Sequence, residues 1–447
     1  MKIARFSRIG FILAAAGSAV GLGNVWKFPY ITGEYGGGAF VMVYLVTVML
    51  VGFSVMVAEL TIGYLSRRDA MTAFETLAPR HKPLWKWGGF MAFTGLLIMT
   101  FYSVVIGWIF NYIVVAIGNL PASPEEAATV FKTMLGSDVS TQIFFHTVAF
   151  VIITAIVMRG IKGGIEKLNL LLMPLLFIIV GGMFLYATTM DAFPKAWHFM
   201  FATDWSKLNS EAFVTAVGHA FFTLSLGMGS LLTYAASLPK EASIVRSTLA
   251  VIVLDTGIAL LAGLMLFTFL YQYGAEPSAG PGLVFISLPA VFYQMGVLGN
   301  LFAVLFFVAL AFAGLTSAVS LVEPMVQLVI DRFGVSRVKA SAMAGLFFYL
   351  IGIAVIYSGS SEYGSTLTWG GKNLFDWADF LTTSVMLPVG GLVMAVFVGY
   401  VIEKERIEAV LGSQLGLFCG VWRFALRYIA PIALVIVMLN LLGVLKL

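Results

Sequence analysis

Charged side chains are scarce in this chain. Asp, Glu, Lys and Arg make up 11% of its 447 residues, against about 25% in ordinary soluble domains. Hydrophobic residues make up 60%, and mean hydropathy is +0.98. One water-soluble core cannot bury so much apolar surface. The apolar runs are continuous rather than the roughly 10-residue alternating strands of a membrane barrel, so the sequence predicts an all-α polytopic membrane protein.

Cysteine and the common catalytic motifs are also missing. Cys419 is the single cysteine, which excludes an internal disulfide and argues against thiol redox chemistry. The chain has no H-E-x-x-H, no G-x-S-x-G, no P-loop and no Cys/His cluster at metal-ligand spacing. The G-x-G of "GLGN" follows no strand, which excludes a dinucleotide-binding fold. We therefore expect neither an enzyme nor an organic cofactor.

Eleven apolar segments are long enough to cross a bilayer, which takes about 20 residues per helix. The predicted spans are 10–30, 39–65, 88–118, 142–158, 166–189, 211–237, 243–271, 294–330, 338–357, 378–402 and 424–443. The first is rich in glycine and reads as a retained span, so we expect no cleavable signal peptide. No linker divides the chain, which predicts one domain over residues 1–447.

Lys and Arg are unevenly distributed between the loops. If the N-terminus is cytoplasmic, twenty of the 26 basic residues fall on the cytoplasmic side; the others are Lys27, Lys132, Lys195, Lys207, Lys372 and Lys446. The positive-inside rule therefore predicts an internal N-terminus and, with eleven spans, an external C-terminus. The net charge of +4 follows from this topology, and we expect no nucleic-acid partner.

Two spans are interrupted by glycine at comparable positions. The first contains "GSAVGLGN" and the sixth contains "SLGMGS". Matched interruptions are typical of transporters built from structural repeats, because broken helices expose carbonyls to cations and helix N-termini to carboxylates. For the first span alone, close packing through the Gly17–Gly21 pair is an equal alternative.

Polar side chains lie within several apolar spans. They are Glu59, Tyr102, Thr223, Ser225, Asp255, Thr316, Ser317 and Glu323. An intramembrane carboxylate costs roughly 2.5–3.5 kcal/mol on insertion scales. Asp255 has no basic neighbour in its own helix, so it requires a cation, a proton or a partner from another helix. Glu59 is interpreted as a structural brace.

Four motifs, in order along the whole chain, resemble the neurotransmitter:sodium symporter family in its bacterial amino-acid branch. They are "GSAVGLGNVWKFPY", "GGGAFVMVYL", "AFFTLSLGMGSLLTYA" and "FAGLTSAVSLVEP". The resemblance implies two inverted five-helix repeats, about 8–190 and about 211–402, with helices 1 and 6 unwound mid-membrane. An extra helix follows at about 424–443, and the twelfth helix of many members is missing. We expect a bacterial cytoplasmic-membrane symporter that functions as a monomer in the lipid bilayer.

The resemblance also implies two sodium sites. The first would use oxygens of Ala19, Asn24, Thr223 and Asp255 together with the substrate carboxylate. The second would use backbone oxygens of Gly17, Val20 and Ala313 with the hydroxyls of Thr316 and Ser317. Cages of oxygen ligands suit a hard cation.

A substrate site is implied between the two broken helices. The amides of Leu22 and Gly23 and the hydroxyl of Tyr102 would bind the substrate carboxylate. Carbonyls would bind its ammonium group at Phe221, Thr223 and Ser225. The remaining residues would surround the side chain, with Phe222 as an aromatic lid: Ser18, Ala19, Ile98, Phe222, Met228, Ser317 and Leu321.

Three positions depart from parts of the family. Asp255 stands where many members have Asn, so we expect chloride independence, with a proton returning on this carboxylate. Gly21 stands where amine carriers have Asp, which favours an amino acid over a monoamine. Met228 is unbranched and adaptable, which predicts a broad pocket for Leu, Met, Phe, Tyr or Trp.

Gates are expected on both sides of the site. Lys27 would pair with Asp379 or Asp376 above Phe222, and the spacing onward to "GGL" favours Asp379. On the inside, Asp331 and Tyr234 match the family, but Arg5 stands where a Trp is usual, and either Lys2 or Arg5 would pair with Asp331. Gly164 and Pro174 have the spacing with which the family unwinds helix 5, although a simple kink is the alternative.

Other functions remain open from the sequence. A proton-coupled carrier of the same fold would not need Thr316 and Ser317 as ligands. An amino-acid sensor that does not transport shares every site residue. A channel would need a continuous polar lining, whereas the polar groups here gather at one depth.

Overall fold

A computed structural model describes residues 5–275, 280 and 282–445. Helices joined by turns and loops make up this part of the chain, with one isolated bridge between Trp369 and Lys372. Its first half contains α1 (Arg8–Ala19), α2 (Phe28–Glu34), α3 (Gly38–Thr47), α4 (Phe53–Ser66), α5 (Ala70–Leu77), α6 (Lys82–Trp85), α7 (Ala92–Ile117), α8 (Pro124–Gly136), α9 (Val139–Met158), α10 (Glu166–Ala187) and α11 (Phe193–Phe201). Its second half contains α12 (Ser210–Thr223), α13 (Ser230–Ala236), α14 (Ile244–Gln272), α15 (Leu288–Gln294), α16 (Val297–Phe333), α17 (Arg337–Gly359), α18 (Leu374–Phe380), α19 (Leu387–Val396), α20 (Lys404–Leu415), α21 (Phe418–Phe424) and α22 (Ala430–Leu441).

Short π-helical turns join several of these helices into longer ones. They link α3 to α4, α18 to α19 and α21 to α22, and one turn, Ile161–Ile165, precedes α10. Within the described residues, nine continuous helices are long and apolar enough to span a membrane, and α1 with Gly23–Glu34 makes a bent tenth. The predicted span 211–237 is divided between α12 and α13, so the count of eleven stays a prediction.

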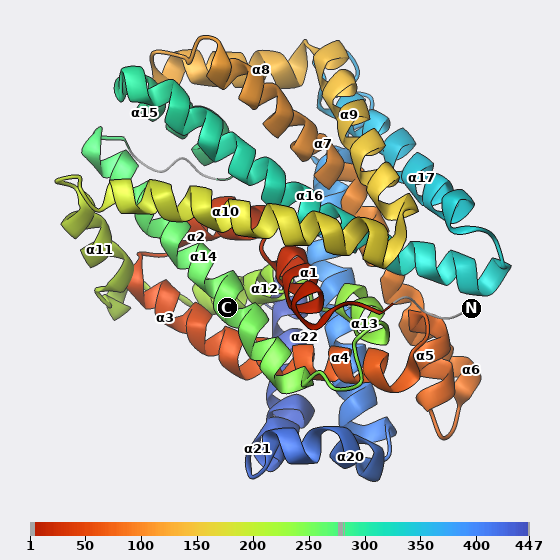
Figure 1. The fold of residues 1–447 in the computed structure, drawn as a ribbon. Coiled ribbons are helices and arrows are strands. Elements are labelled where there is room, and N and C mark those ends of the chain that lie inside the picture. The colour runs from red at the N-terminus through yellow and green to blue at the C-terminus, as the bar shows by residue number, and fades with distance from the viewer. Residues whose placement is uncertain (1–4, 276–279, 281, 446–447) are drawn as a thin grey trace.

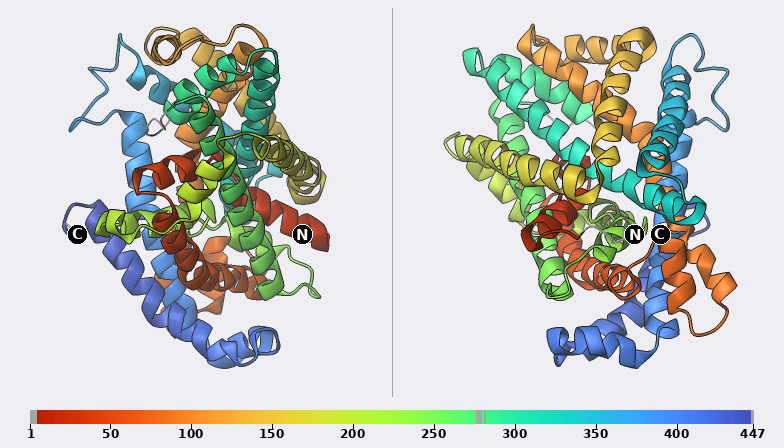
Figure 2. Two further views of the ribbon diagram at one scale, coloured as in Figure 1. Left: turned by 90° about the vertical axis from the view of Figure 1, so that its left-hand side faces the viewer. Right: turned by 45° about the vertical axis from the view of Figure 1, so that its right-hand side comes forward.

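The two interrupted helices lie in the middle of the molecule. Figure 1 shows α1, α12 and α13 near the centre, with the long helices α10, α14 and α16 beside them. α1 packs against α10, α13, α14 and α16. α20 lies at one end of the molecule and α8 at the other, as Figure 1 and Figure 2 both show. The broken helices are thus enclosed by continuous ones.

Glycines let the helices around the centre approach one another closely. A Cβ atom on Gly63 of α4 would lie 2.0 Å from the carbonyl oxygen of Leu232 in α13. One on Gly95 of α7 would lie 2.4 Å from the carbonyl oxygen of Leu321 in α16. Small residues at such contacts are the usual basis of helix association in membranes. They position α7 and α16 against the centre, where the candidate site lies.

Candidate substrate and cation site

The first break follows α1. Val20 takes an extended conformation, with φ −68° and ψ 99°, and Gly23–Lys27 forms a π-helical turn before α2. The axes of Arg8–Ala19 and Gly23–Glu34 differ by 47°. Since the regular hydrogen-bond ladder stops at Ala19, carbonyls of the last turn of α1 are available to other partners.

The second break lies between α12 and α13. Ser225, Gly227 and Gly229 all have positive φ, at 53°, 79° and 78°, a region that glycine enters at little cost. The Ser225 hydroxyl donates to the carbonyl oxygen of Ser18 at 2.6 Å. Glu59 of α4 accepts from the backbone N–H groups of Gly227 at 3.1 Å and Leu232 at 3.3 Å. Glu59 therefore braces the break, as the sequence interpretation had it.

The residues predicted for the first sodium ion lie together and are buried. Asn24 donates from Nδ2 to Oδ1 of Asp255 at 2.7 Å, and Thr223 donates to the same oxygen at 3.0 Å. Ala19 ends α1 at the adjacent break and is 3% exposed. The second carboxylate oxygen of Asp255, Oδ2, has no hydrogen-bond partner although the side chain is fully buried. A buried acceptor without a hydrogen-bond partner is costly. The free oxygen of Asp255 and the polar groups around it therefore fit a bound cation.

The residues predicted for the second sodium ion also meet. The Ser317 hydroxyl lies 3.1 Å from the carbonyl oxygen of Gly17 and 3.5 Å from that of Val20. The Thr316 hydroxyl lies 3.1 Å from the carbonyl oxygen of Ala313. We call Gly17, Val20, Ala313, Thr316 and Ser317 the α1–α16 oxygen set. Its five oxygens belong to the classes that hard cations prefer.

A cavity lies between the two breaks, and we call it the central cavity. It has about 330 Å³ of atom-free space, a figure that includes space open to solvent. Twelve of the thirteen residues predicted to bind substrate line it, together with Gly21: Ser18, Ala19, Leu22, Gly23, Ile98, Tyr102, Phe222, Thr223, Ser225, Met228, Ser317 and Leu321. Its lining combines a polar region around Tyr102 and the breaks with apolar side chains of α7, α16 and the second break.

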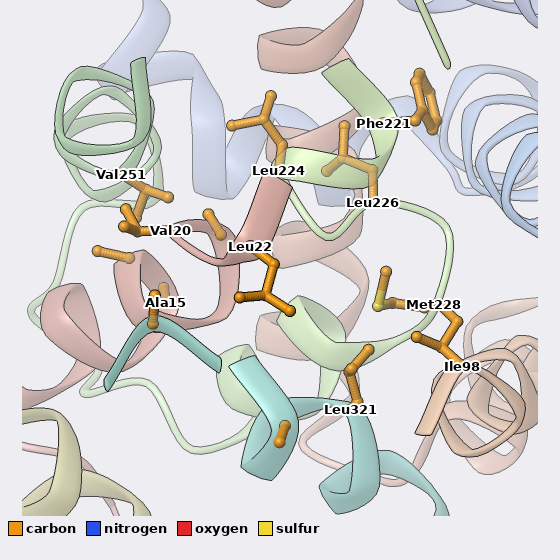
Figure 3. Packing of buried hydrophobic residues seen from close by; sticks show 14 of the residues in the cluster. Ala15, Val20, Leu22, Ile98, Phe221, Leu224, Leu226, Met228, Val251 and Leu321 are labelled. Atoms are coloured by element: carbon orange, nitrogen blue, oxygen red, sulfur yellow. The ribbon is translucent and has the colours of Figure 1, made fainter. Parts of the chain in front are cut away.

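Phe221 is the predicted substrate residue that does not line the cavity. Its ring packs against α19, where a Cβ on Gly391 would lie 2.2 Å from it, and its carbonyl accepts from the N–H of Leu226 at 3.0 Å. Figure 3 shows Met228, Ile98 and Leu321 gathered beside Leu22, with Phe221 apart from them.

A second cavity adjoins the first, and we call it the Lys27 cavity. It shares Leu22, Gly23, Tyr102 and Phe222 with the central cavity, so the two cavities meet at these residues, Phe222 among them. The ammonium of Lys27 lies 4.7 Å from the centroid of that ring, within cation–π range.

The structure separates the two acidic candidates for the gate. Asp379 lines the Lys27 cavity, without a direct ion pair to Lys27. Asp376 instead forms a capping box with Asn373 at the start of α18. The preference for Asp379 therefore agrees with the geometry, and Asp376 has a structural role.

A third, open cavity contains the predicted inner-gate residues Arg5 and Asp331, and we call it the Asp331 cavity. Arg5 and Asp331 make no ion pair with each other; Asp331 accepts from Gln327 at 3.0 Å. Tyr234 is buried nearby against the ring of Phe6, at 5.4 Å between centroids. Lys2 lies outside the described residues.

Sequence reasoning missed three partners around this cavity. Arg337 forms a two-point ion pair with the fully buried Glu323, at 2.6 and 2.9 Å. Arg67 donates to the carbonyls of Ala236 and Leu238 at the end of α13. Phe6 packs an aromatic ring against Tyr234, one position after Arg5, which stands where the family usually has Trp. The one available signal was that Glu323, a buried carboxylate, requires a cationic partner.

The fifth predicted span is continuous in this structure from Ile161 to Ala187, through the π-helical turn into α10. Gly164 lies in its initial π-helical turn, and a Cβ there would lie 2.0 Å from the carbonyl oxygen of Ile156. Pro174 lies inside α10. Close packing against Ile156 therefore explains why glycine is needed at position 164. Unwinding between Gly164 and Pro174 stays a prediction.

The chain resembles one known protein family along nearly its whole length. Residues 4–129 and 132–446 match the model of the Sodium:neurotransmitter symporter family. An uncharacterized sodium-dependent transporter of Bacillus subtilis, YhdH, is 37% identical over 98% of both chains. One from Methanocaldococcus jannaschii is 32% identical over 96% of this chain and 88% of the relative. The crystal structure of MhsT in complex with L-phenylalanine matches 99% of this chain and all of that one, with a TM-score of 0.90 and 39% identity.

Proposed function

The chain belongs to the sodium:neurotransmitter symporter family, whose members are sodium-dependent transporters rather than enzymes, and we propose that it imports hydrophobic and aromatic L-amino acids. Import proceeds by alternating access with sodium as the coupling ion. The observation that carries the substrate class is the central cavity, which joins polar groups at two helix breaks to Ile98, Met228 and Leu321. Such a lining accepts a zwitterion at one end and an apolar side chain at the other.

Two features favour an amino acid over a monoamine. A Cβ on Gly21 would lie 2.6 Å from the Ser317 hydroxyl oxygen and 3.2 Å from that of Tyr102. No carboxylate side chain fits there without displacing both, so the substrate supplies its own carboxylate. The MhsT structure at 39% identity is a complex with L-phenylalanine, which supports an aromatic substrate here.

Two sodium ions are coupled to each substrate in this proposal. Ala19, Asn24, Thr223 and Asp255 would hold one together with the substrate carboxylate. The α1–α16 oxygen set would hold the other. When substrate is present, the positive charge of the ions attracts oxygens at both helix breaks and so holds the two breaks together. Two sodium ions moving through 100 mV, with tenfold sodium gradients, provide roughly 7 kcal/mol, enough for about 10⁵-fold accumulation. A proton returned outward against the same potential would use about 2.3 kcal/mol of this.

Asp255 makes the transporter chloride-independent. Its carboxylate is a fixed negative charge beside the first sodium set, so no mobile anion is needed there. The same carboxylate is placed to carry a proton back after sodium leaves. The orphaned Oδ2 atom supports this assignment.

The proposed topology places one gate on each side of the membrane. The N-terminus and the Asp331 cavity face the cytoplasm of a bacterial cell, and the C-terminus lies outside. Residues 8–190 and 211–402 form the two inverted repeats of a single domain that works as a monomer. Lys27 and Asp379 close the external side above Phe222, and Arg5 with Asp331 and Tyr234 the internal side. Lys27 and Asp379 are half-buried in the lining of the Lys27 cavity; when that cavity holds water, an ion pair between them is worth about 0–1 kcal/mol, which suits a gate that opens repeatedly.

Uptake of labelled leucine, phenylalanine and tryptophan into proteoliposomes tests the function. External sodium is replaced by potassium or choline, at pH 6 and pH 8, with and without chloride. Uptake that requires an inward sodium gradient and not chloride is the expected result. Uptake driven by protons without sodium would indicate a proton-coupled carrier of the same fold. Sodium-dependent binding without uptake would indicate a sensor.

A further inference from the structure

An open cavity lies where α20 meets α21, and we call it the α20–α21 cavity. Figure 1 shows both helices at the lower end of the molecule, away from the central cavity. Six residues of α20, α21 and the π-helical turn after α21 line it: Lys404, Glu408, Cys419, Gly420, Arg423 and Arg427. Its atom-free space is about 710 Å³, a figure that includes space open to solvent. Three cations and one carboxylate give this lining a net charge of +2.

The positive charge of the lining is only partly neutralised by the protein. Lys404 pairs with Glu408 at 3.3 Å. Among the described residues, Arg423 has no ion-pair or hydrogen-bond partner, although its Nε atom is shielded from solvent. The positive-inside rule explains basic residues in this part of the chain, but it does not require a shielded donor without an acceptor. Because such a donor is costly, the cavity fits a ligand that brings acceptor oxygens.

Arg427 is held in position at the same cavity. Its Nε atom donates to the carbonyl oxygen of Gly399 at 2.6 Å, and its guanidinium lies 5.0 Å from the centroid of the Tyr400 ring. The Tyr400 hydroxyl donates back to the carbonyl oxygen of Arg427 at 3.0 Å. Within residues 5–275, 280 and 282–445, the two terminal nitrogens of Arg427 have no partner. A fixed guanidinium with free terminal nitrogens is suited to phosphate oxygens.

An exposed apolar stripe runs beside the basic residues on the same helix. Val421, Phe424 and Tyr428 are all exposed. Phe424 directly follows Arg423, and Tyr428 directly follows Arg427, so the basic and apolar stripes are neighbours on the helix surface. A soluble phosphate compound would not use the apolar stripe, whereas the acyl chains of a lipid would.

The apolar stripe continues along α22 for the depth of one lipid leaflet. Ile432 and Ile436 are also exposed. Arg427 and Ile436 are nine positions apart, a rise of about 13 Å, which is close to half of the roughly 30 Å hydrocarbon core. The helix Phe418–Leu441 is also the least buried of the nine continuous candidate spans among the described residues. Its surface is therefore available to lipid.

The chain path assigns the cavity to one side of the membrane. The helix Leu374–Val401 carries Asp379 of the Lys27 cavity near its start and ends just before α20. The α20–α21 cavity therefore lies on the side opposite the proposed external gate. In the proposed topology this is the cytoplasmic side, where anionic lipids attract basic residues.

We propose that the α20–α21 cavity binds the headgroup of an anionic phospholipid from the cytoplasmic leaflet. Arg423 and Arg427 donate to the free oxygens of its phosphodiester, and an acyl chain lies along the apolar stripe. A choline or ethanolamine headgroup is disfavoured, because its cationic end would meet a lining that is itself positive. The bound lipid links α20 to the last span. Binding does not depend on transport, and only the choice of leaflet rests on the proposed function and its topology.

Cys419 makes this proposal testable in the unmodified protein. It is the single cysteine of the chain, is partly exposed and lines the cavity, so its rate of reaction with a maleimide reports whether the cavity is occupied. The purified protein in a neutral detergent is titrated with dioleoyl phosphatidylglycerol, dioleoyl phosphatidylcholine or glycerol 3-phosphate. Phosphatidylglycerol at ten times its half-protecting concentration should slow the reaction about tenfold, since only the unoccupied protein then reacts. Phosphatidylcholine and glycerol 3-phosphate should leave the rate unchanged.

Two variants and a matched control locate the binding in the cavity. Arg423→Gln should raise the half-protecting concentration of phosphatidylglycerol about fivefold, the usual effect of one basic residue at an anionic membrane surface. Arg423→Glu should abolish protection. Arg406→Gln removes the same charge from α20 outside the cavity, where Arg406 pairs with Glu403 at 2.9 Å, and should keep the wild-type value. The thermal unfolding temperature without lipid should be unchanged in Arg423→Gln, which decides the matter where Arg423→Glu does not fold.

Four results would overturn the lipid site. Equal protection by phosphatidylcholine would mean that the headgroup charge is not recognised, and equal protection by glycerol 3-phosphate would make the ligand a soluble phosphate compound. Equal shifts in Arg406→Gln and Arg423→Gln would indicate diffuse attraction to the lipid rather than a site. Absence of any protection in the folded wild type would exclude binding at Cys419. Because the assay requires no sodium and no uptake, its failure and a failure of the transport proposal are distinguished.

Discussion

The hydroxyl of Ser225 donates a hydrogen bond to the carbonyl oxygen of Ser18 over 2.6 Å. This bond joins the break of the sixth span to the break of the first, 207 residues apart in the chain. Ser225 holds a positive φ of 53°, which is unfavourable for a residue with a side chain. The contact between the two breaks therefore stabilises a backbone conformation that the local sequence disfavours.

Replacing Ser225 should weaken the link between the breaks. Ser225→Ala keeps the strained φ and loses the hydrogen bond, at a cost of about 1 kcal/mol. Ser225→Gly loses the same bond but relieves the strain. We expect the thermal unfolding temperature to fall more for Ala than for Gly, with weaker substrate binding in both. Equal unfolding temperatures in all three proteins would contradict a role for this bond.

Asp255→Asn should make transport respond to chloride. The substitution removes the fixed charge beside Asn24 and Thr223 but keeps one hydrogen-bonding oxygen. We expect a sodium requirement raised about tenfold or more, corresponding to at least 1.4 kcal/mol, and partial recovery of uptake when chloride replaces gluconate. Asp191→Asn, at an exposed position, is the matched control. Sodium dependence unchanged from the wild type would remove Asp255 from the cation site.

Gly21→Ala should abolish substrate binding. Its Cβ would lie 2.6 Å from the Ser317 hydroxyl oxygen, in the central cavity and beside the α1–α16 oxygen set. Gly181→Ala, where nothing lies within 4 Å, should leave binding intact. Sodium-dependent binding of labelled phenylalanine to the purified protein measures both. Normal binding by Gly21→Ala would mean that the cavity is not the substrate site.

Met228→Phe should narrow the substrate range. The Met228 side chain is 2% exposed and lines the central cavity beside Ile98, so a rigid ring there leaves less room for a large substrate. We expect the ratio of tryptophan to leucine kcat/KM to fall about tenfold or more, which pocket contacts of this size can provide. Met42→Phe, at an exposed position, serves as control. An unchanged ratio of tryptophan to leucine kcat/KM would show that Met228 does not determine substrate specificity.

Arg337→Leu should be strongly destabilising. It leaves the fully buried carboxylate of Glu323 without its cation, and breaking a buried pair in this way costs about 3–5 kcal/mol. Adding Glu323→Leu should recover much of the loss, since no charge then remains buried. Thermal unfolding in detergent measures the series. A double variant no more stable than Arg337→Leu would show that the pair is not the source of the effect.

Much of the site was accessible from sequence because it depends on local chemistry. The glycines of "GSAVGLGN" and "SLGMGS" mark the two breaks, since glycine takes positive φ at little cost. The family motifs then place Ser18, Tyr102 and Met228 at one cavity, where the structure has them. Phe221 was predicted to offer its carbonyl oxygen to the substrate; it does not line the central cavity, and that oxygen accepts from the N–H of Leu226.

The composition and spacing of this chain determined that it is a membrane protein of many helices, two of them broken, because hydropathy and backbone preference act over a few residues. Only the tertiary structure decided which buried polar group meets which. Asn24 meets Asp255 across 231 positions, and Glu323 meets Arg337 at the start of the next helix. Asp379 rather than Asp376 faces the Lys27 cavity, because Asp376 caps its own helix. Such partners depend on how closely distant helices approach, and no local pattern encodes that distance.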